Sequence, residues 1–187
     1  MSNQSKALVY NESPVARWLF RNVKSSWLWL IVRVYLGYEW LTAGLHKVES
    51  DAWMKGGAAL KGYWTNAVTV PEGGKSVVNY DWYRAFLQSL LDSQSYVWFG
   101  KLVAIGETLV GVALILGVFT GLAAFFGGFM NFNYLLAGTI STNPVLLVLA
   151  ILVLAAWKVA GYWGLDRFVL RWLKILKDPR VNSAPGA

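Results

Sequence analysis

The chain has 187 residues, of which 56% are hydrophobic and only 14% are charged, whereas a soluble domain normally carries about a quarter charged residues. It has no cysteine and a single histidine, His46, which excludes disulfides, thiolate metal sites, iron–sulfur clusters held by cysteine, covalently attached haem and haem held between two histidines. The net charge is +7, and the basic residues flank apolar segments, so anionic lipid is a better partner for them than nucleic acid.

Four apolar segments of about 20 residues are each long enough to cross the ~30 Å hydrocarbon core of a bilayer as a helix. In chain order they cover residues 27–45, 97–117, 119–138 and 145–164. The turns that join the last three segments are short, which makes neighbouring helices antiparallel. The sequence therefore predicts an all-α fold. The predicted fold is a single-domain integral membrane four-helix bundle that covers residues 1–187, with a long extracytoplasmic loop between helices 1 and 2.

The long loop and the C-terminal tail each contain a further predicted feature. The loop, residues 46–96, is rich in tryptophan and tyrosine, and Asp81 is predicted to cap a helix within it. These aromatic residues favour a belt at the outer membrane interface, and a lid or a docking surface is the alternative. Residues 166–176 predict an amphipathic helix on the inner leaflet, with a plain continuation of the fourth helix as the alternative.

Lysine and arginine set the predicted orientation. The two tails together hold nine basic and three acidic residues, whereas the basic and acidic residues of the loop cancel. Cytoplasmic segments of membrane proteins carry the excess of Lys and Arg. We therefore expect a multi-pass protein of the cell membrane with both termini in the cytoplasm and the loop outside.

Charged side chains inside the predicted spans are costly, so each is a candidate for function. The first span contains Arg33 and Glu39, and the second contains Lys101 and Glu107. Counting ~1.5 Å of depth per residue from the inner end puts Arg33 level with Glu107, and Glu39 level with Lys101. This predicts two ion pairs. Either pair can fix helix packing or can belong to a proton relay or quinone site, and the sequence leaves both open.

Three more polar side chains lie toward the outer end of the spans. His46 follows Glu39 along one face of the first helix, which is consistent either with an outward proton path or with a plain interfacial histidine. Asn131 and Asn133 in the third span either bridge helices or contact a ligand. The sequence has no phosphate-binding glycine motif, zinc-protease motif or nucleophile–base set, and no metal site is predicted.

Several stretches resemble the DoxX/DoxD family of four-span membrane proteins. They are RVYLGYEWLTAGLHK at 33–47, GETLVGVALILGVFTG at 106–121 and the polar segment from Asn131 to Asn143. The loop run GGAALKGYW at 56–64 is closer to the DoxD branch. The resemblance covers roughly residues 27–165, and Arg33, Lys47 and Glu107 match charged residues that recur in the family.

The resemblance implies a membrane redox role, because DoxD is the large subunit of a thiosulfate:quinone oxidoreductase that works with a smaller subunit, DoxA. The expected function is a quinone-reactive redox subunit, which would bind its quinone non-covalently and would oxidise thiosulfate. Its expected catalytic residues are Glu107, Arg33, Glu39 and His46, and its expected substrate contacts are Lys47, Lys101, Asn131 and Asn133. The expected partners are membrane lipid, the quinone, a small DoxA-like subunit and further copies of the chain, and not nucleic acid.

Two other functions are compatible with the same sequence. A non-catalytic scaffold of the DoxX type would recruit redox partners through the outer loop. A small transporter is the third interpretation, and the absence of an obviously broken helix among the predicted spans argues against it.

Overall fold

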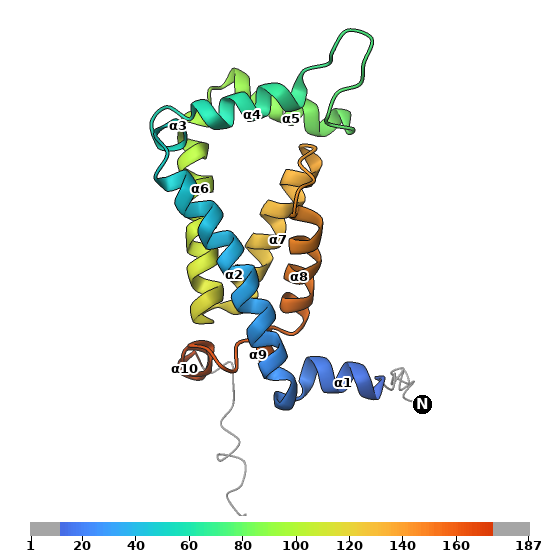
Figure 1. Ribbon diagram of the computed structural model, residues 1–187, viewed down its shortest axis with the longest axis vertical. Helices are drawn as coiled ribbons and strands as arrows, with labels where there is room; N and C mark the ends of the chain where they lie inside the picture. Colours follow the sequence, from blue (N-terminus) through green and yellow to red (C-terminus); the bar gives the residue numbers. More distant parts are fainter. Residues whose placement is uncertain (1–11, 174–187) are drawn as a thin grey trace, which may run out of the picture.

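The structure is a computed structural model that describes residues 12–173. Every regular element in that range is a helix, which confirms the all-α prediction. Four long helices form the body: α2 (Ser26–Val48), α6 (Tyr96–Leu116), α7 (Thr120–Leu136) and α8 (Asn143–Ala155). Helix α2 lies along α6 and α7 lies along α8, and the two pairs diverge from one end of the body toward the other (Figure 1).

The open end of the body is covered by the segment that joins α2 to α6. This segment is largely helical, with α3 (Asp51–Met54), α4 (Ala58–Val68) and α5 (Asp81–Asp92). We call these three helices the roof (Figure 1). Helix α5 begins at Asp81 as expected, but the Asp81 carboxylate does not cap it and instead accepts a hydrogen bond from Arg84 at 2.7 Å.

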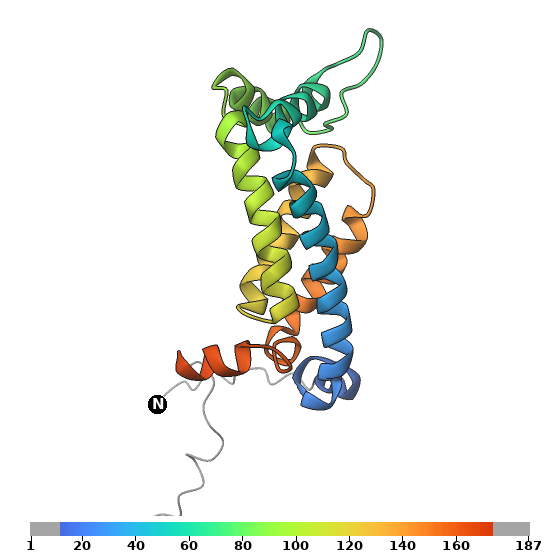
Figure 2. The ribbon, with the colours of Figure 1, turned by 60° about the vertical axis from the view of Figure 1, so that its left-hand side comes forward.

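The other end of the body, which we call the base, carries two helices that lie across the bundle axis. They are α1 (Pro14–Arg21) and α10 (Asp166–Trp172), and both are seen at the base in Figures 1 and 2. Helix α10 occupies the described part of the predicted 166–176 helix, and positions 174–176 lie outside the described residues. Turns between residues 161 and 165 separate it from the preceding helix, so it is not a plain continuation of it.

The fourth predicted span is divided. Helix α8 ends at Ala155, Ala156 leaves the helical conformation with φ −95° and ψ 11°, and a short helix α9 (Trp157–Ala160) follows. Neither proline nor glycine lies at this break, which is why the apolar run 145–164 predicted one continuous helix. The fourth span is therefore broken, and the prediction of unbroken helices, which counted against a transporter, is wrong here.

Glycines allow α2 and α6 to approach closely. A Cβ atom on Gly44 would lie 2.4 Å from the Thr108 nitrogen, and one on Gly111 would lie 2.4 Å from the Leu41 nitrogen. Real Cβ atoms do not come this close to backbone, so these contacts exist only because both positions lack a side chain. The glycines therefore fix how far α2 is shifted along α6.

The resulting register differs from the one that the sequence predicted. Gly37 lies beside Ile115, whereas counting depth from the inner ends placed Gly37 level with Val103, a difference of about three helical turns. The cause is an offset between the two helices. At the base, Arg33 is the eighth residue of α2 but already lies at the last turn of α6, beside the Leu114 carbonyl, and at the roof end α6 continues past the end of α2. There Gly100 lies against the backbone of Trp53 in α3. Equal distances from the helix ends consequently do not mean equal depth.

Among the helices of residues 12–173, α6 is the one that is long and apolar enough to cross a membrane by itself. Helix α8 is apolar but has 13 residues, and α7 has 17. Helix α2 has 23 residues but contains Arg33, Glu39 and Lys47. The outward faces of all four helices nevertheless expose large apolar side chains, among them Ile31, Leu109, Phe125, Phe129, Val148 and Ile151.

Candidate functional site

A buried carboxylate joins three helices in the roof-side half of the body. Glu107 of α6 is 1% exposed. Its Oε2 accepts a hydrogen bond from Lys47 Nζ of α2 at 2.6 Å, and its Oε1 accepts one from the Tyr134 hydroxyl of α7 at 2.5 Å. The Lys47 side chain is 20% exposed and its Nζ also lies 5.3 Å from the centre of the Trp53 ring in the roof. We call Lys47, Glu107 and Tyr134 the relay cluster.

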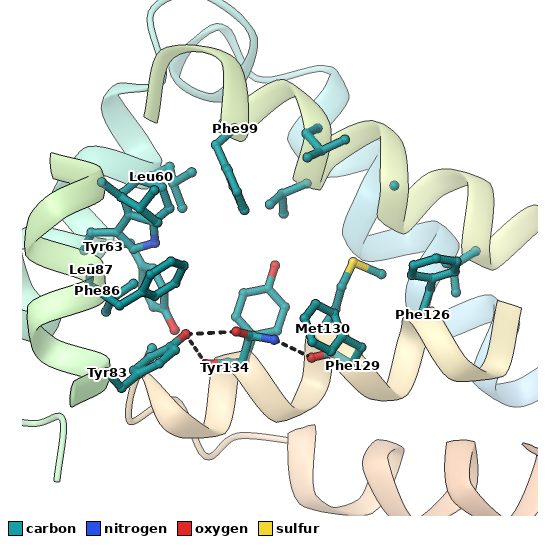
Figure 3. A pocket seen from close by; sticks show the side chains of 18 of the residues that line it. Leu60, Tyr63, Tyr83, Phe86, Leu87, Phe99, Phe126, Phe129, Met130 and Tyr134 are labelled. Carbon is teal, nitrogen blue, oxygen red and sulfur yellow. Dashed lines mark hydrogen bonds between the residues drawn. The ribbon is translucent and has the colours of Figure 1, made fainter. Parts of the chain in front are cut away.

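A cavity of about 470 Å³ lies beside the relay cluster, between α6 and α7 and beneath the roof (Figure 3). Its lining is almost entirely aliphatic and aromatic, and includes Leu60, Phe99, Phe126 and Met130. The Tyr134 side chain forms part of the wall, while its hydroxyl is bonded to Glu107. One tyrosine therefore separates the cavity from a buried carboxylate.

The cavity opens sideways, between the outward faces of α6 and α7. Four lining side chains of α6 and α7 are themselves about half exposed: Leu102 (55%), Leu109 (62%), Phe126 (48%) and Phe129 (56%). These residues also belong to the apolar outer surface of the body. An apolar molecule in contact with that surface can thus reach the cavity without passing through the roof.

Two tyrosines tie the roof to the nearby end of α7. The Tyr83 hydroxyl donates to the backbone and side-chain oxygens of Asn133, both at 3.2 Å, and the Tyr63 hydroxyl is 2.8 Å from the Thr139 hydroxyl. Burial, with a smaller contribution from Tyr63, raises the pKa of Tyr83 to about 12. Burial also raises the pKa of Tyr63. Both hydroxyls therefore keep their protons at neutral pH.

The predicted pair of Arg33 with Glu107 is wrong. Arg33 is 1% exposed but lies toward the base, where its Nη1 donates to the Leu114 carbonyl at 2.7 Å and to the Ile115 carbonyl at 3.5 Å. Carbonyls in the last turn of a helix have no partner within it and carry the negative end of the helix dipole. Arg33 therefore stabilises the end of α6 and not the relay cluster.

Asp166 of α10 stabilises the other side of the same turn. Its two carboxylate oxygens accept hydrogen bonds from the backbone nitrogens of Phe119 at 2.6 Å and Thr120 at 2.9 Å, where α7 begins. An acidic group at a helix N-terminus satisfies free N–H groups and complements the dipole. The α6–α7 turn is thus held by Arg33 on one side and by Asp166 on the other.

The predicted pair of Glu39 with Lys101 is also wrong. Lys101 is exposed and Glu39 is half-buried, and neither side chain makes an ion pair or hydrogen bond within residues 12–173. The register of α2 against α6 accounts for both errors, since each pair was inferred from depth. His46 is exposed at the roof end of α2 and likewise has no side-chain partner in the described part of the chain. Of the four predicted catalytic residues, Glu107 alone belongs to the relay cluster.

The two predicted asparagines have different surroundings. Asn133 lines the cavity and accepts the Tyr83 hydrogen bond. Asn131 is completely buried, and neither polar atom of its side chain has a partner among the described residues. The same holds for Nε1 of Trp40, which lies in the contact between α2 and α7 close to Gly127.

The tyrosines of the site were not among the residues predicted from the sequence. Tyr134 lies four positions after Met130 in α7, a spacing that puts both side chains on one face of a helix, and this pattern was the available signal. Tyr63 and Tyr83 were interpreted as part of an interfacial belt. Lys47 was predicted as a contact for an anionic substrate, whereas here it is bonded to Glu107.

No protein-family model, no curated protein and no solved structure matches the chain. The likeness to the DoxX/DoxD family therefore stays a hypothesis.

Proposed function

We propose that the chain is a multi-pass membrane protein whose four long helices cross the bilayer, with both termini in the cytoplasm. The large apolar side chains exposed on all four helices support this arrangement, because they would be costly in water and are suited to lipid. The basic excess in the two tails favours a cytoplasmic base. The roof would then lie on the outer side of the membrane.

We further propose that the protein is a quinone-reactive redox subunit and that the cavity between α6 and α7 binds the quinone ring. One observation carries this proposal: the cavity is apolar, opens onto the apolar outer surface of α6 and α7, and has the relay cluster behind one wall. Its volume of about 470 Å³ falls in the usual range for small-molecule sites. Aromatic side chains such as Phe99 and Phe129 offer faces against which a quinone ring can pack.

The residues around the cavity suit proton exchange with such a ligand. A bound quinone would supply a group that takes up two electrons and two protons. The Tyr134 hydroxyl is placed to pass a proton between the cavity and Glu107, which accepts its hydrogen bond. Lys47 compensates the buried carboxylate, belongs to the last turn of α2 at the roof and is 20% exposed. Protons would accordingly exchange with the outer side of the membrane.

The electron donor is proposed from the family resemblance alone. Thiosulfate would reach the outer face, where the segment that joins α2 to α6 carries the exposed lysines Lys55 and Lys61. A small DoxA-like subunit would be the partner. Lys47 is a less direct contact for this anion than the sequence suggested, because its ammonium group is bonded to Glu107.

The cavity assignment is tested by filling the cavity. Gly106 lines it, and a Cβ atom there would meet nothing closer than the Met130 sulfur at 4.0 Å, so Gly106→Leu extends a side chain into open space. Gly62→Leu in α4 is the matched control, because no atom lies within 4 Å of its Cβ position and it does not line the cavity. Binding of a short-chain quinone to purified protein in nanodiscs is measured by quenching of tryptophan fluorescence.

We expect wild type and Gly62→Leu to bind the quinone alike, and Gly106→Leu to bind it at least about tenfold more weakly, which corresponds to 1.4 kcal/mol. A Tyr134→Phe variant, which keeps the ring but loses the hydroxyl, should bind normally and lose thiosulfate-dependent quinone reduction. Equal binding by Gly106→Leu and wild type would rule out the cavity as the site.

A non-catalytic scaffold is the second candidate, and the roof provides the observation in its favour. Tyr80 and Trp82, at the start of α5, are 54% and 63% exposed on the outer surface. Exposed aromatic residues of this kind are common at the centre of protein interfaces. On this interpretation no variant binds quinone, and a Trp82→Ser change impairs assembly with the partner subunit.

A further inference from the structure

We propose that a groove at the base, between α1 and α9, binds the phosphate headgroup of an anionic phospholipid. The groove has a volume of about 590 Å³, and its lining includes Ser13, Arg21, Trp157 and Lys158. It is remote from the cavity between α6 and α7, which lies under the roof and shares no lining residue with the groove. The proposal requires the body to lie in a bilayer but is independent of what the cavity binds.

The groove brings together two cations that are far apart in the sequence. Arg21 ends α1 and Lys158 lies in α9, and both side chains are exposed, so both can turn toward a phosphate. Lys158 has no acidic partner within residues 12–173, and its Nζ lies 5.4 Å from the centre of the Trp157 ring. Among the described residues, Glu12 is the one acidic residue that lines the groove, and it is paired with Arg21. The groove thus has a net positive charge.

Helix α1, which forms one wall, is fixed in place by contacts with α2. The Trp29 indole nitrogen donates to the Leu19 carbonyl at 2.7 Å, and the Phe20 and Trp29 rings are 5.6 Å apart. In this position α1 lies across the bundle axis (Figures 1 and 2) and exposes Val15 (71%) and Trp18 (42%). Such amphipathic helices, with basic residues on the polar face, are typical of segments that lie in the membrane interface.

The surroundings of the groove favour a phospholipid over a free phosphate ion. Behind the two cations the lining is apolar, with Phe20, Ala155 and Val159. The groove also adjoins the outward face of α8, where Ile151 is 55% exposed. A phospholipid can place its phosphate between the cations and its acyl chains along α8, whereas an inorganic ion gains only the electrostatic contacts. Basic pockets at the cytoplasmic side of spanning helices are recognised sites for lipid headgroups.

The proposal is tested with full-length protein purified in detergent and titrated with short-chain phosphatidylglycerol. Parallel titrations use short-chain phosphatidylcholine and inorganic phosphate, and native mass spectrometry measures the fraction bound. The variants are Arg21→Gln and Lys158→Gln in the groove, with Lys24→Gln as the matched control. Lys24 is an exposed cation at the same end of the molecule but does not line the groove. Circular dichroism verifies the helical fold of each variant.

We expect phosphatidylglycerol to bind more tightly than phosphatidylcholine, and Arg21→Gln and Lys158→Gln each to weaken it by about fivefold. Lys24→Gln should change binding by less than about twofold. Glu12→Gln should strengthen binding, because it removes the carboxylate that competes for Arg21. Equal weakening by Lys24→Gln and Lys158→Gln, weaker binding by Glu12→Gln, or equally tight binding of phosphatidylcholine or inorganic phosphate would each overturn the proposal.

Discussion

The two members of the ion pair in the relay cluster differ in their access to water. Glu107 is 1% exposed, whereas the Lys47 side chain is 20% exposed and has a long flexible stem. Removing one partner of a buried ion pair leaves the other charge uncompensated, which costs about 3–5 kcal/mol in soluble proteins. A lysine can relieve much of that cost by turning its ammonium group toward water. The penalty should therefore depend on which partner is removed.

We predict that Lys47→Gln lowers the free energy of unfolding by about 3 kcal/mol, and that Glu107→Gln lowers it by only about 1 kcal/mol. Chemical unfolding in detergent micelles, followed by circular dichroism, measures both values. Lys55→Gln is the control, because its ion pair with Asp51 is highly exposed and should contribute less than about 1 kcal/mol. A larger loss for Glu107→Gln than for Lys47→Gln would contradict this account.

At the scale of residues, the sequence identified both members of one ion pair but not that they pair, and it also selected Glu39 and Lys101, which have no side-chain partner within residues 12–173. Glu107 and Lys47 were both recognised, and neither was matched to the other. The pairing depends on the shift of α2 along α6, and that shift is set by contacts such as Gly44 with Thr108. Depth counted from the ends of an apolar run does not contain this information. Tyr134 was missed because a tyrosine in an apolar helix has no charge to mark it.

At the scale of elements, the contact of α2 with α6 depends on positions without side chains. Gly111→Ala would place a Cβ atom 2.4 Å from the Leu41 nitrogen, which forces the helices apart. We predict a loss of about 2–3 kcal/mol in unfolding free energy, within the range for overpacked cores. Gly62→Ala is the control, with open space around its Cβ, and should gain up to about 1 kcal/mol from helix propensity. Thermal unfolding of both variants in one detergent tests the difference, and equal stability would contradict it.

The contact between α5 and α7 through Tyr83 should weaken at alkaline pH. The pKa of Tyr83 is about 12 in the folded protein, against about 10 in an unfolded chain. The folded state therefore holds the proton more tightly, and this stabilisation is complete below pH 10 and is lost as the pH rises toward 12. We predict that Tyr83→Phe is less stable than wild type at pH 8, by about 1 kcal/mol for the lost hydrogen bond, but loses less stability between pH 10 and 12. Parallel pH slopes for the two proteins would contradict this prediction.

The long helices were easier to predict than the short ones, for a physical reason. Long apolar runs alone indicate α2, α6 and α7, and the structure has a helix at each. Helix α1 has eight residues, too few for its periodicity to stand out, and it is held by contacts with Trp29. The break at Ala156 follows no local breaker, and Ala156 is buried in the core. Tertiary packing decides both features, so the local sequence does not show them.

At the scale of the whole molecule, the proposed orientation predicts which positions are accessible from outside the cell. The chain contains no cysteine, so a single introduced cysteine can be labelled without a background signal. We predict that Glu72→Cys, in the exposed loop of the roof segment, reacts with a membrane-impermeant maleimide on intact cells. Lys24→Cys, at the base, should react only after the membrane is opened. The reverse pattern would invert the topology.

The contacts that hold the four helices together differ between the base, where α6 turns into α7, and the roof end. Arg33 and Asp166 clamp both sides of this turn, whereas the far ends of the helices meet the roof partly through two tyrosine hydroxyls. We therefore expect the pair α2–α6 and the pair α7–α8 to separate more easily at the roof end than at the base. Thermal breathing should widen the cavity from the roof downward. If the proposed function is correct, a partner subunit docked on the roof would hold the two helix pairs together and slow the exit of a quinone from the cavity.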